Sequence, residues 1–426
     1  MGVERKRLLL AAATTGYQTR VFAEAARRLG VEFVLATDRC HTLEDPWWDG
    51  AVPVKFDLAS EPGRLEARFG RGYFDGVVAL GDRPAVLAAR VAERLGIPFH
   101  SAAGARACQD KHLARQLFDR AGLPVPRYRR VPLAAEPAHI ASETAFPCVL
   151  KPLGLSASRG VIRADKEEEF CAAFRRIVQI LEAPEIRRSH SEQDRYVQIE
   201  DYIPGREFAL EGIVTHGQLQ VLALFDKPDP LEGPYFEETI YVTPSREPAG
   251  TQREIAEAVQ KTVDALGLRH GPVHAEMRHN AGGVWMLEVA ARPIGGLCAK
   301  ALRFTGDVTL EELILRHALG EDVSGAARRD PASGVMMIPI PKAGIYQDVS
   351  GIERAAAVPG IFHVEITAKQ GQQLVPLPEG NSYLGFLFAR GPTPRSVEEV
   401  LRRAHAELGF EITAALPVLH LARGGT

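Results

Sequence analysis

The stretch GPVHAEMRHNAGGVWMLEVAARPIGG, residues 271–296, predicts two strands joined by a tight turn. Apolar and polar residues alternate over 273–277 and again over 284–289, and the glycines after residue 281 allow the positive φ of a short hairpin loop. When the segment is folded about Gly282, Glu276 lies opposite Glu288. Like charges directly opposite each other destabilise a sheet, and a cation between them removes that cost.

Two facing carboxylates form a hard-oxygen site of the kind that Mg²⁺ (or Mn²⁺) shares with substrate phosphates. Arg292 follows Glu288 by four residues, so a continued strand places both on one face. The alternative is a surface ribbon whose charged side chains are solvated. His274, two residues before Glu276, suggests a zinc ligand, but the absence of further soft ligands in the nearby sequence favours a histidine that packs or hydrogen-bonds beside the site.

Length and composition set the class of protein. The 426 residues suggest about two to three domains. Hydrophobic residues at 46% and charged residues at 25% are typical of a soluble globular chain. A net charge of −3 argues against a nucleic-acid partner. No run approaches the roughly 20 apolar residues of a membrane span. The five cysteines are scattered, which favours a cytoplasmic protein.

The two ends of the chain have different patterns. Residues 1–105 alternate apolar strands and amphipathic helices, with a last short strand expected at 97–100, which predicts a Rossmann-like parallel sheet. The turn after its first strand lacks G-x-G-x-x-G, so a dinucleotide site has little support. Residues 330–426 predict a small α+β module. The fold class is therefore α/β combined with α+β.

The middle of the chain carries phosphate-type features. Lys111 begins a predicted helix, and a strand ends at Lys151 just before the Gly/Ser loop 154–160. Backbone N–H groups of such a loop can bind phosphate oxygens, and a lysine adds a point charge. Residues 226–245, rich in proline, predict a long loop, and such loops are commonly functional.

These motifs, together with the signature Glu288-Val-Ala-Ala-Arg292, resemble the ATP-grasp superfamily, and most of all its L-amino acid ligase branch, which forms dipeptides. The resemblance implies a pre-ATP-grasp domain at 1–105. It implies an ATP-grasp domain at 106–325, with a nucleotide lid at about 151–207 and a metal hairpin at 272–292. It implies a C-terminal ligase domain at 330–426.

The resemblance also implies roles for individual residues. The ATP phosphates are expected to meet Lys111, Lys151, Gly154, Ser156, Ser158 and Gly160. Adenine is expected to meet Glu200, Asp201, Tyr202 and Ile203, and the ribose Glu207. Mg²⁺ is expected on Glu276 and Glu288. The expected catalytic residues are Arg292 and Lys151, and the expected substrate contacts are Arg292, Glu237, Gly295 and Gly296.

The implied function is an ADP-forming carboxylate–amine ligase that joins amino acids or short peptides through an acyl phosphate, working as a homodimer without a membrane partner. Ala290 stands where the family usually has asparagine, which leaves the number of Mg²⁺ ions open. A non-catalytic nucleotide-binding protein and an enzyme activating bicarbonate or formate are the alternatives. The sequence names neither the amino acids nor the general base, for which Glu237, Glu238 and the N-terminal domain are candidates.

Overall fold

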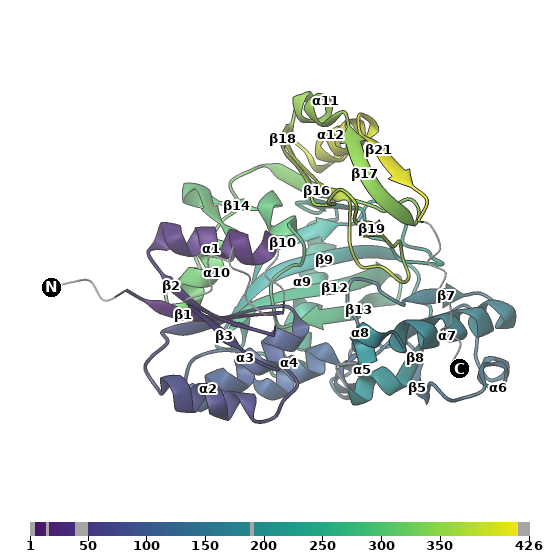
Figure 1. Ribbon diagram of the computed structural model, residues 1–426, viewed down its shortest axis with the longest axis horizontal. Coiled ribbons are helices and arrows are strands. Elements are labelled where there is room, and N and C mark those ends of the chain that lie inside the picture. The colour runs from purple at the N-terminus through teal and green to yellow at the C-terminus, as the bar shows by residue number, and fades with distance from the viewer. Residues whose placement is uncertain (1–4, 14–16, 39–49, 188–190, 416–426) are drawn as a thin grey trace, which may run out of the picture.

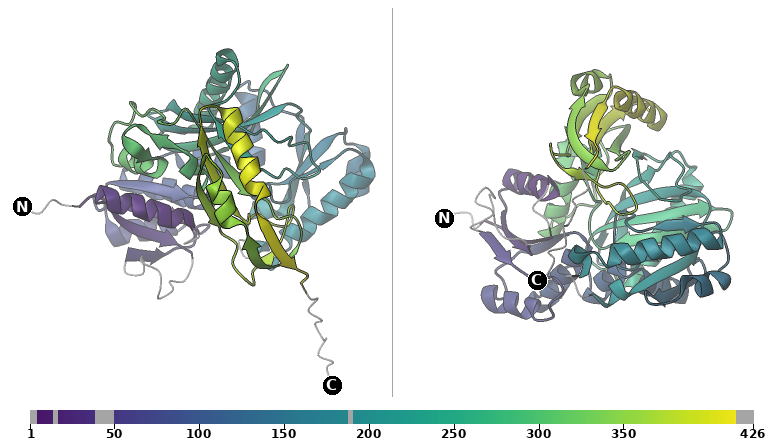
Figure 2. Two further views of the ribbon diagram at one scale, coloured as in Figure 1. Left: turned by 90° about the horizontal axis from the view of Figure 1, so that it is seen from above. Right: turned by 45° about the vertical axis from the view of Figure 1, so that its right-hand side comes forward.

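The computed structural model describes residues 5–13, 17–38, 50–187 and 191–415. Figure 1 shows an N-terminal module in purple and blue, a central sheet in teal and green, and a C-terminal module in yellow-green above that sheet. A fourth group of elements, formed by residues 128–201, lies at the right of the same view. The two views in Figure 2 show the C-terminal module standing over the other parts. The predicted combination of α/β and α+β architecture is confirmed.

The N-terminal module is a four-stranded parallel sheet of order β3-β2-β1-β4. Its strands are β1 (Arg7–Ala12), β2 (Glu32–Thr37), β3 (Ala51–Pro53) and β4 (Gly76–Leu80), and its helices are α1 (Tyr17–Leu29), α2 (Glu61–Phe69), α3 (Asp82–Leu95) and α4 (Ala102–Gln109). The expected strand at 97–100 is wrong. This segment leads into the α4 cap Ser101, and its His100 ring bonds to the Pro272 carbonyl of the central sheet instead of pairing with β4.

A second sheet, of order β5-β8-β6-β7, spans residues 128–201. This region includes most of the nucleotide lid expected at about 151–207, and we call it the lid from here on. Its strands are β5 (Tyr128–Pro132), β6 (Cys148–Pro152), β7 (Ile162–Ala164) and β8 (Tyr196–Asp201), and its helices are α6 (Pro137–Ser142), α7 (Glu167–Leu181), α8 (Pro184–Arg187) and η2 (Glu192–Arg195). Helix α5 (Lys111–Arg120) precedes it. Phe170, Phe174 and Ile177 of α7 fill a core separate from the rest of the molecule.

The central sheet has eight antiparallel strands in the order β13-β12-β9-β10-β11-β16-β20-β18. They are β9 (Arg206–Thr215), β10 (Gln218–Asp226), β11 (Ile240–Thr243), β12 (Gly271–Asn280), β13 (Gly283–Ala290), β16 (Ala332–Ile338), β18 (Ile361–Ile366) and β20 (Gly385–Gly391). Helix α9 (Ala249–Leu266) packs against β10 and β13. The expected loop 226–245 is partly wrong, because its buried segment β11 pairs with β10 and β16.

The remaining elements complete the C-terminal half. They are η3 (Cys298–Ala301), β14 (Arg303–Phe304), η4 (Thr305–Asp307), β15 (Val308–Thr309), α10 (Leu310–Ala318), β17 (Gly344–Ser350), α11 (Ile352–Ala357), β19 (Gln373–Leu374), α12 (Pro394–Ala406) and β21 (Gly409–Thr413). Strands β16, β18 and β20 extend the central sheet across the predicted boundary at 325–330, so one continuous sheet carries residues of both regions. None of the helices in the described ranges combines the length and apolar character that a membrane crossing requires.

Candidate functional site

A cavity of about 620 Å³ lies where the N-terminal module, the lid, the central sheet and the C-terminal module meet. Most of the site residues expected from sequence line it: Lys111, Lys151, Gly154, Ser156, Ser158, Glu200, Asp201, Tyr202, Ile203, Glu207, Glu276, Glu288, Arg292, Gly295 and Gly296. Two of the expected residues, Gly160 and Glu237, are not among the lining residues. The backbone N–H of Gly160 donates instead to the Pro378 carbonyl at 2.9 Å.

The hairpin of β12 and β13 contains the predicted pair of acids, although the pairs next to its turn are offset by one residue from a fold about Gly282. Glu276 pairs directly with Glu288, and Gly283 takes a φ of 98° at the turn. A bulge directly after Glu276 shifts the pairing, so that Met277 lies opposite Met286. The two carboxylates face different cations, because Glu276 contacts Lys227 whereas Glu288 contacts Lys111. In the folded hairpin, each of the two acids therefore has its own lysine partner.

Lys111 links the hairpin to the Gly/Ser loop 154–160. Its Nζ lies 3.4 Å from Glu288 Oε2 and donates to the Leu155 carbonyl at 2.5 Å. The residue sits in the first turn of α5, where Asp110 caps the helix by accepting the backbone N–H of the two residues after Lys111. In the loop itself, Ala157 and Ser158 adopt φ values of 56° and 55°. Such values are unusual for residues other than glycine and cluster at ligand-binding segments.

Glu200 is held by two cations, Lys151, which was expected at the site, and Arg115, which was not. Lys151 Nζ donates to Glu200 Oε2 at 2.6 Å, and Arg115 Nε donates to Glu200 Oε1 at 2.7 Å. Burial alone would raise the pKa of Glu200, but Arg115 and Lys151 hold it well below its usual range. Arg115 also donates to the Met286 carbonyl of β13 at 2.8 Å. The carboxylate thus ties the lid to the hairpin, a role beyond the expected contact with adenine.

The signal that could have identified Arg115 was its spacing. It lies four residues after Lys111 on α5, so both side chains share one helix face. An arginine on a helix is ordinarily solvated, which is why the sequence alone did not distinguish it.

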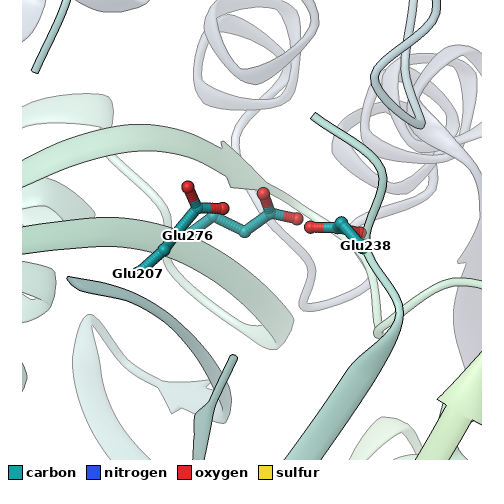
Figure 3. A group of neighbouring side chains, drawn as sticks. All are labelled: Glu207, Glu238 and Glu276. Carbon is teal, nitrogen blue, oxygen red and sulfur yellow. The ribbon is translucent and has the colours of Figure 1, made fainter. Parts of the chain in front are cut away.

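Three carboxylates gather around Lys227. Oxygen atoms of Glu207, Glu238 and Glu276 lie within 4.8 Å of one another, and Figure 3 shows these groups pointing toward one place from different segments. Lys227 Nζ donates to Glu207 Oε1 at 2.8 Å, lies 3.3 Å from Glu276 Oε2 and also bonds to Glu238. Burial would lower the pKa of Lys227, but the surrounding carboxylates raise it well above its usual value. The lysine is therefore a charged ammonium that neutralises part of the cluster.

Glu207 has a second cationic partner in Arg278, whose Nε donates to Glu207 Oε2 at 2.9 Å. Glu238 lines the cavity, whereas its neighbour Glu237 is half-buried outside it, and burial raises the pKa of that carboxyl. Alternation along an extended segment explains the difference, because successive side chains point to opposite faces. Of the two acids considered from sequence, Glu238 is the one in position to reach a ligand.

His274 lies between two acids. Its Nδ1 is 3.2 Å from Glu211 Oε2, and its Nε2 is 3.3 Å from Glu276 Oε1. Burial would lower the pKa of His274, but hydrogen bonds to Glu211 and Glu276 raise it to about 9. Both ring nitrogens therefore have carboxylate partners, so the predicted hydrogen-bonding role is confirmed. Among the described residues, the group that could hold a metal consists of Glu207, Glu238 and Glu276 and does not include His274. Glu211 also accepts the Ile294 N–H at 3.1 Å, next to Gly295 and Gly296.

Arg292 lies beyond the end of β13 and reaches the cavity without strand pairing. Its Nε donates to Asp82 Oδ1 at 3.0 Å, and its Nη1 donates to the Pro293 carbonyl at 3.1 Å. The expected cause of its position, a strand continuing past Ala290, is wrong. The position is set by the bend at residues 291–292 and by Asp82 of the N-terminal module.

Three family models match the chain in order. Residues 23–99 match the ATP-grasp N-terminal domain, residues 144–301 the ATP-grasp domain, and residues 336–413 the L-amino acid ligase C-terminal domain 2. The chain therefore contains ATP-grasp domains followed by a domain similar to that of L-amino acid ligases, as the sequence motifs predicted.

Individual relatives are distant. The uncharacterized protein y4rH of Sinorhizobium fredii is 25% identical, over 96% of this chain and 84% of that protein. Alanine–anticapsin ligase of Bacillus subtilis is 27% identical over 53% of this chain, and the match spans only about half, 50%, of that relative's length.

Solved structures share the fold. L-amino acid ligase from Bacillus licheniformis superimposes with a TM-score of 0.77 at 24% identity, covering 96% of this chain and all, 100%, of that one. Carboxyaminoimidazole ribonucleotide synthase from Aspergillus clavatus, solved with ATP, gives a TM-score of 0.67 at 16% identity, covering 94% and 97% of the two chains. At these identities the likeness concerns the fold. The matched domains and the ligases among the sequence relatives support an ATP-grasp ligase in general.

Proposed function

We propose that the protein is an ADP-forming ligase that activates one amino acid as an acyl phosphate and joins it to the amine of another amino acid or a short peptide. The observation that carries the proposal is the cavity, because it brings phosphate-type lysines, a carboxylate pair and Arg292 together with residues of the C-terminal module. Met337, Asn381 and Tyr383 are the lining residues from that module. The module's match to L-amino acid ligases favours amino-acid substrates.

ATP would lie between the lid and the central sheet. Lys111, Lys151 and the backbone of the loop from Gly154 would hold its phosphates, and the segment 201–203 would face adenine. Both lysines already have acidic partners, Glu288 and Glu200, so each ammonium is fixed near the loop before a nucleotide arrives. A prearranged positive surface of this kind suits phosphoryl transfer, in which positioning and charge neutralisation supply most of the catalysis.

The residues at the hairpin fit Mg²⁺. Glu276 and Glu288 face each other, and Glu207 and Glu238 bring further carboxylate oxygens, the donors that a hard cation prefers. Glu276 and Glu288 would hold the ion, and Mg²⁺ when bound neutralises phosphate charge. Lys227 would offset the remaining negative charge of the cluster.

Arg292 and Glu238 are the side chains that we propose to assist the second step, in which the amine attacks the acyl phosphate. The amine of the second substrate attacks the acyl carbon, a C–N bond forms, and phosphate leaves with the electron pair of the broken C–O bond. The intermediate's oxyanion would be stabilised by Arg292, which lines the cavity beside Gly295 and Gly296. Glu238 is the carboxylate we propose as proton acceptor for the amine, because it lines the cavity and burial raises its pKa.

The purified protein tests the proposal directly. Pairs of amino acids are incubated with Mg-ATP, while ADP is measured enzymatically and the products by mass spectrometry. We expect ADP and a peptide, and a hydroxamate when hydroxylamine replaces the amine. AMP and pyrophosphate would contradict the acyl phosphate. ADP formed with bicarbonate or formate alone would favour the carboxylase-like alternative. Binding of ATP without turnover would favour a non-catalytic nucleotide-binding protein. Light scattering tests the expected homodimer.

A further inference from the structure

Asp82 and Arg292 form an ion pair between two parts of the chain that are 210 residues apart. Arg292 Nε lies 3.0 Å from Asp82 Oδ1, and Arg292 Nη2 lies 3.4 Å from Asp82 Oδ2. Side-chain exposure is 18% for Asp82 and 14% for Arg292. Two parallel contacts fix the plane of a guanidinium as well as its place. Both residues line the cavity.

The position of Asp82 is itself well determined. It is the first residue of α3, after Gly81, whose φ of 108° makes the sharp turn out of β4. A carboxylate at a helix N-terminus is stabilised by the helix dipole. Arg292 is buried, which would lower its pKa, but Asp82 and then Glu288 raise it above the usual arginine value. The guanidinium of Arg292 is therefore held in its charged form beside Asp82.

The hydrogen bonds of Arg292 show that the ion pair with Asp82 orients the guanidinium. Nη1 is held by the Pro293 carbonyl at 3.1 Å, so three of the five N–H groups have partners that orient the fork. The same segment is held again by α1, where Gln18 Nε2 donates to the Ile294 carbonyl at 3.0 Å. The N-terminal module thus fixes both the arginine and the backbone beside it.

We propose that Asp82 is a positioning residue for the ligation reaction, acting through Arg292 and not by contact with the reacting atoms. The inference rests on the proposed function. It assigns the N-terminal module a part in the chemical step, because without Asp82 the guanidinium keeps its charge and loses its orientation. Misplacement of a catalytic group by about 1 Å costs on the order of 10²-fold in rate.

The test compares Asp82→Ala, Asp82→Asn and Arg292→Ala in steady-state kinetics. We expect Asp82→Ala to lower kcat by about 10- to 100-fold with the KM for ATP within about twofold. Asp82→Asn, which keeps one acceptor oxygen, should lie between it and the wild type, and it serves in place of Asp82→Ala if that variant does not fold. Glu66→Gln is the control, because Glu66 pairs with Arg94 of the same helix α3 on an exposed face.

The double variant decides the mechanism. On an Arg292→Ala background, Asp82→Ala should cause no further loss of kcat, because the two residues act as one unit. A full additional loss, or an effect confined to the KM of the amine substrate, would overturn the inference in favour of direct substrate contact. Wild-type kinetics in Asp82→Ala would overturn it as well. If the wild-type protein itself forms no ADP with any acid and amine, the proposed function fails instead, so the two failures are distinguishable.

Discussion

The ammonium group of Lys111 lies 3.4 Å from the carboxylate of Glu288 and also bonds to the Leu155 carbonyl. One side chain therefore connects the start of α5, the loop after Lys151 and the second strand of the hairpin. The acid proposed to hold Mg²⁺ is already paired with a cation proposed to meet phosphate. These charged groups of the site thus pair with each other, and ligands would exchange one set of partners for another.

The first prediction concerns Glu288. Replacing it with Gln should abolish turnover, because one of the two carboxylates proposed for Mg²⁺ is lost. The free energy of unfolding should change by less than about 1 kcal/mol, since the relieved repulsion with Glu276 is offset by the lost, partly exposed pair with Lys111. ADP release and urea unfolding measure the two effects. Glu254→Gln, which alters an exposed acid paired with His279 near the hairpin, should leave turnover unchanged. Normal Mg²⁺-dependent activity in Glu288→Gln would remove the metal assignment.

The second prediction concerns Lys151. Lys151→Ala should weaken ATP binding by about tenfold or more in calorimetry, because a hydrogen bond to a charged group contributes about 1.5–3 kcal/mol. The matched control is Lys166→Ala, an exposed lysine of the same lid. Mg-ATP should also protect the loop 154–160 from proteolysis in the wild type. Equal nucleotide affinity in both variants would argue against the nucleotide site as a whole.

The third prediction concerns stability. Arg115→Ala should lower the free energy of unfolding by about 3–5 kcal/mol, because Glu200 would stay buried with one of its two cations removed. Arg120→Ala, at the exposed end of the same helix, should change it by less than about 0.5 kcal/mol. Urea titration followed by circular dichroism measures both. Similar losses in the two variants would show that the Arg115–Glu200 pair contributes little.

The fourth prediction concerns acid pH. Burial lowers the pKa of His100 to about 4 and that of His317 to about 3, with nearby histidines adding to the effect at His317. The unfolded chain binds these protons near pH 6.5, so the stabilising contribution of both residues is complete above that value. It is lost as the pH falls from about 6.5 toward 4 and 3.

Thermal melting should therefore show a falling Tm over this pH range. His274 has the opposite sign, because its pKa is raised to about 9, so its contribution is kept in acid and lost as the pH rises through 9. His317→Asn should reduce the slope of Tm against pH between 6.5 and 4, whereas His139→Asn, an exposed control, should leave it unchanged. An unchanged slope in His317→Asn would contradict the assignment.

The hairpin shows how far the sequence alone could go. Alternation and the glycines near the turn predicted the pairing of Glu276 with Glu288, which is observed. The pairs next to the turn are nevertheless offset by one residue from a fold about Gly282, and only the bulge after Glu276, which the sequence pattern did not predict, brings Glu288 opposite Glu276. Local pattern also selected Lys111, Lys151 and the loop 154–160, most of which line the cavity, and the motif order predicted the ATP-grasp fold. The alternation of strands and helices expected for residues 1–105 is present for the same reason, since its signals are local, whereas the strand expected at 97–100 is absent.

Tertiary structure decided which charges meet. Asp82 reaches Arg292, Arg115 reaches Glu200, and Lys227 gathers acids from β9, β12 and the segment before β11, yet none of these pairs is a neighbour in sequence. The strand at 240–243 formed inside an expected loop because β10 and β16 offered it partners on both sides. Sequence period fixes the direction in which a side chain points, whereas its partner depends on how distant segments pack. The sequence thus determined which acidic and basic residues are present, whereas the tertiary structure determined which of them pair.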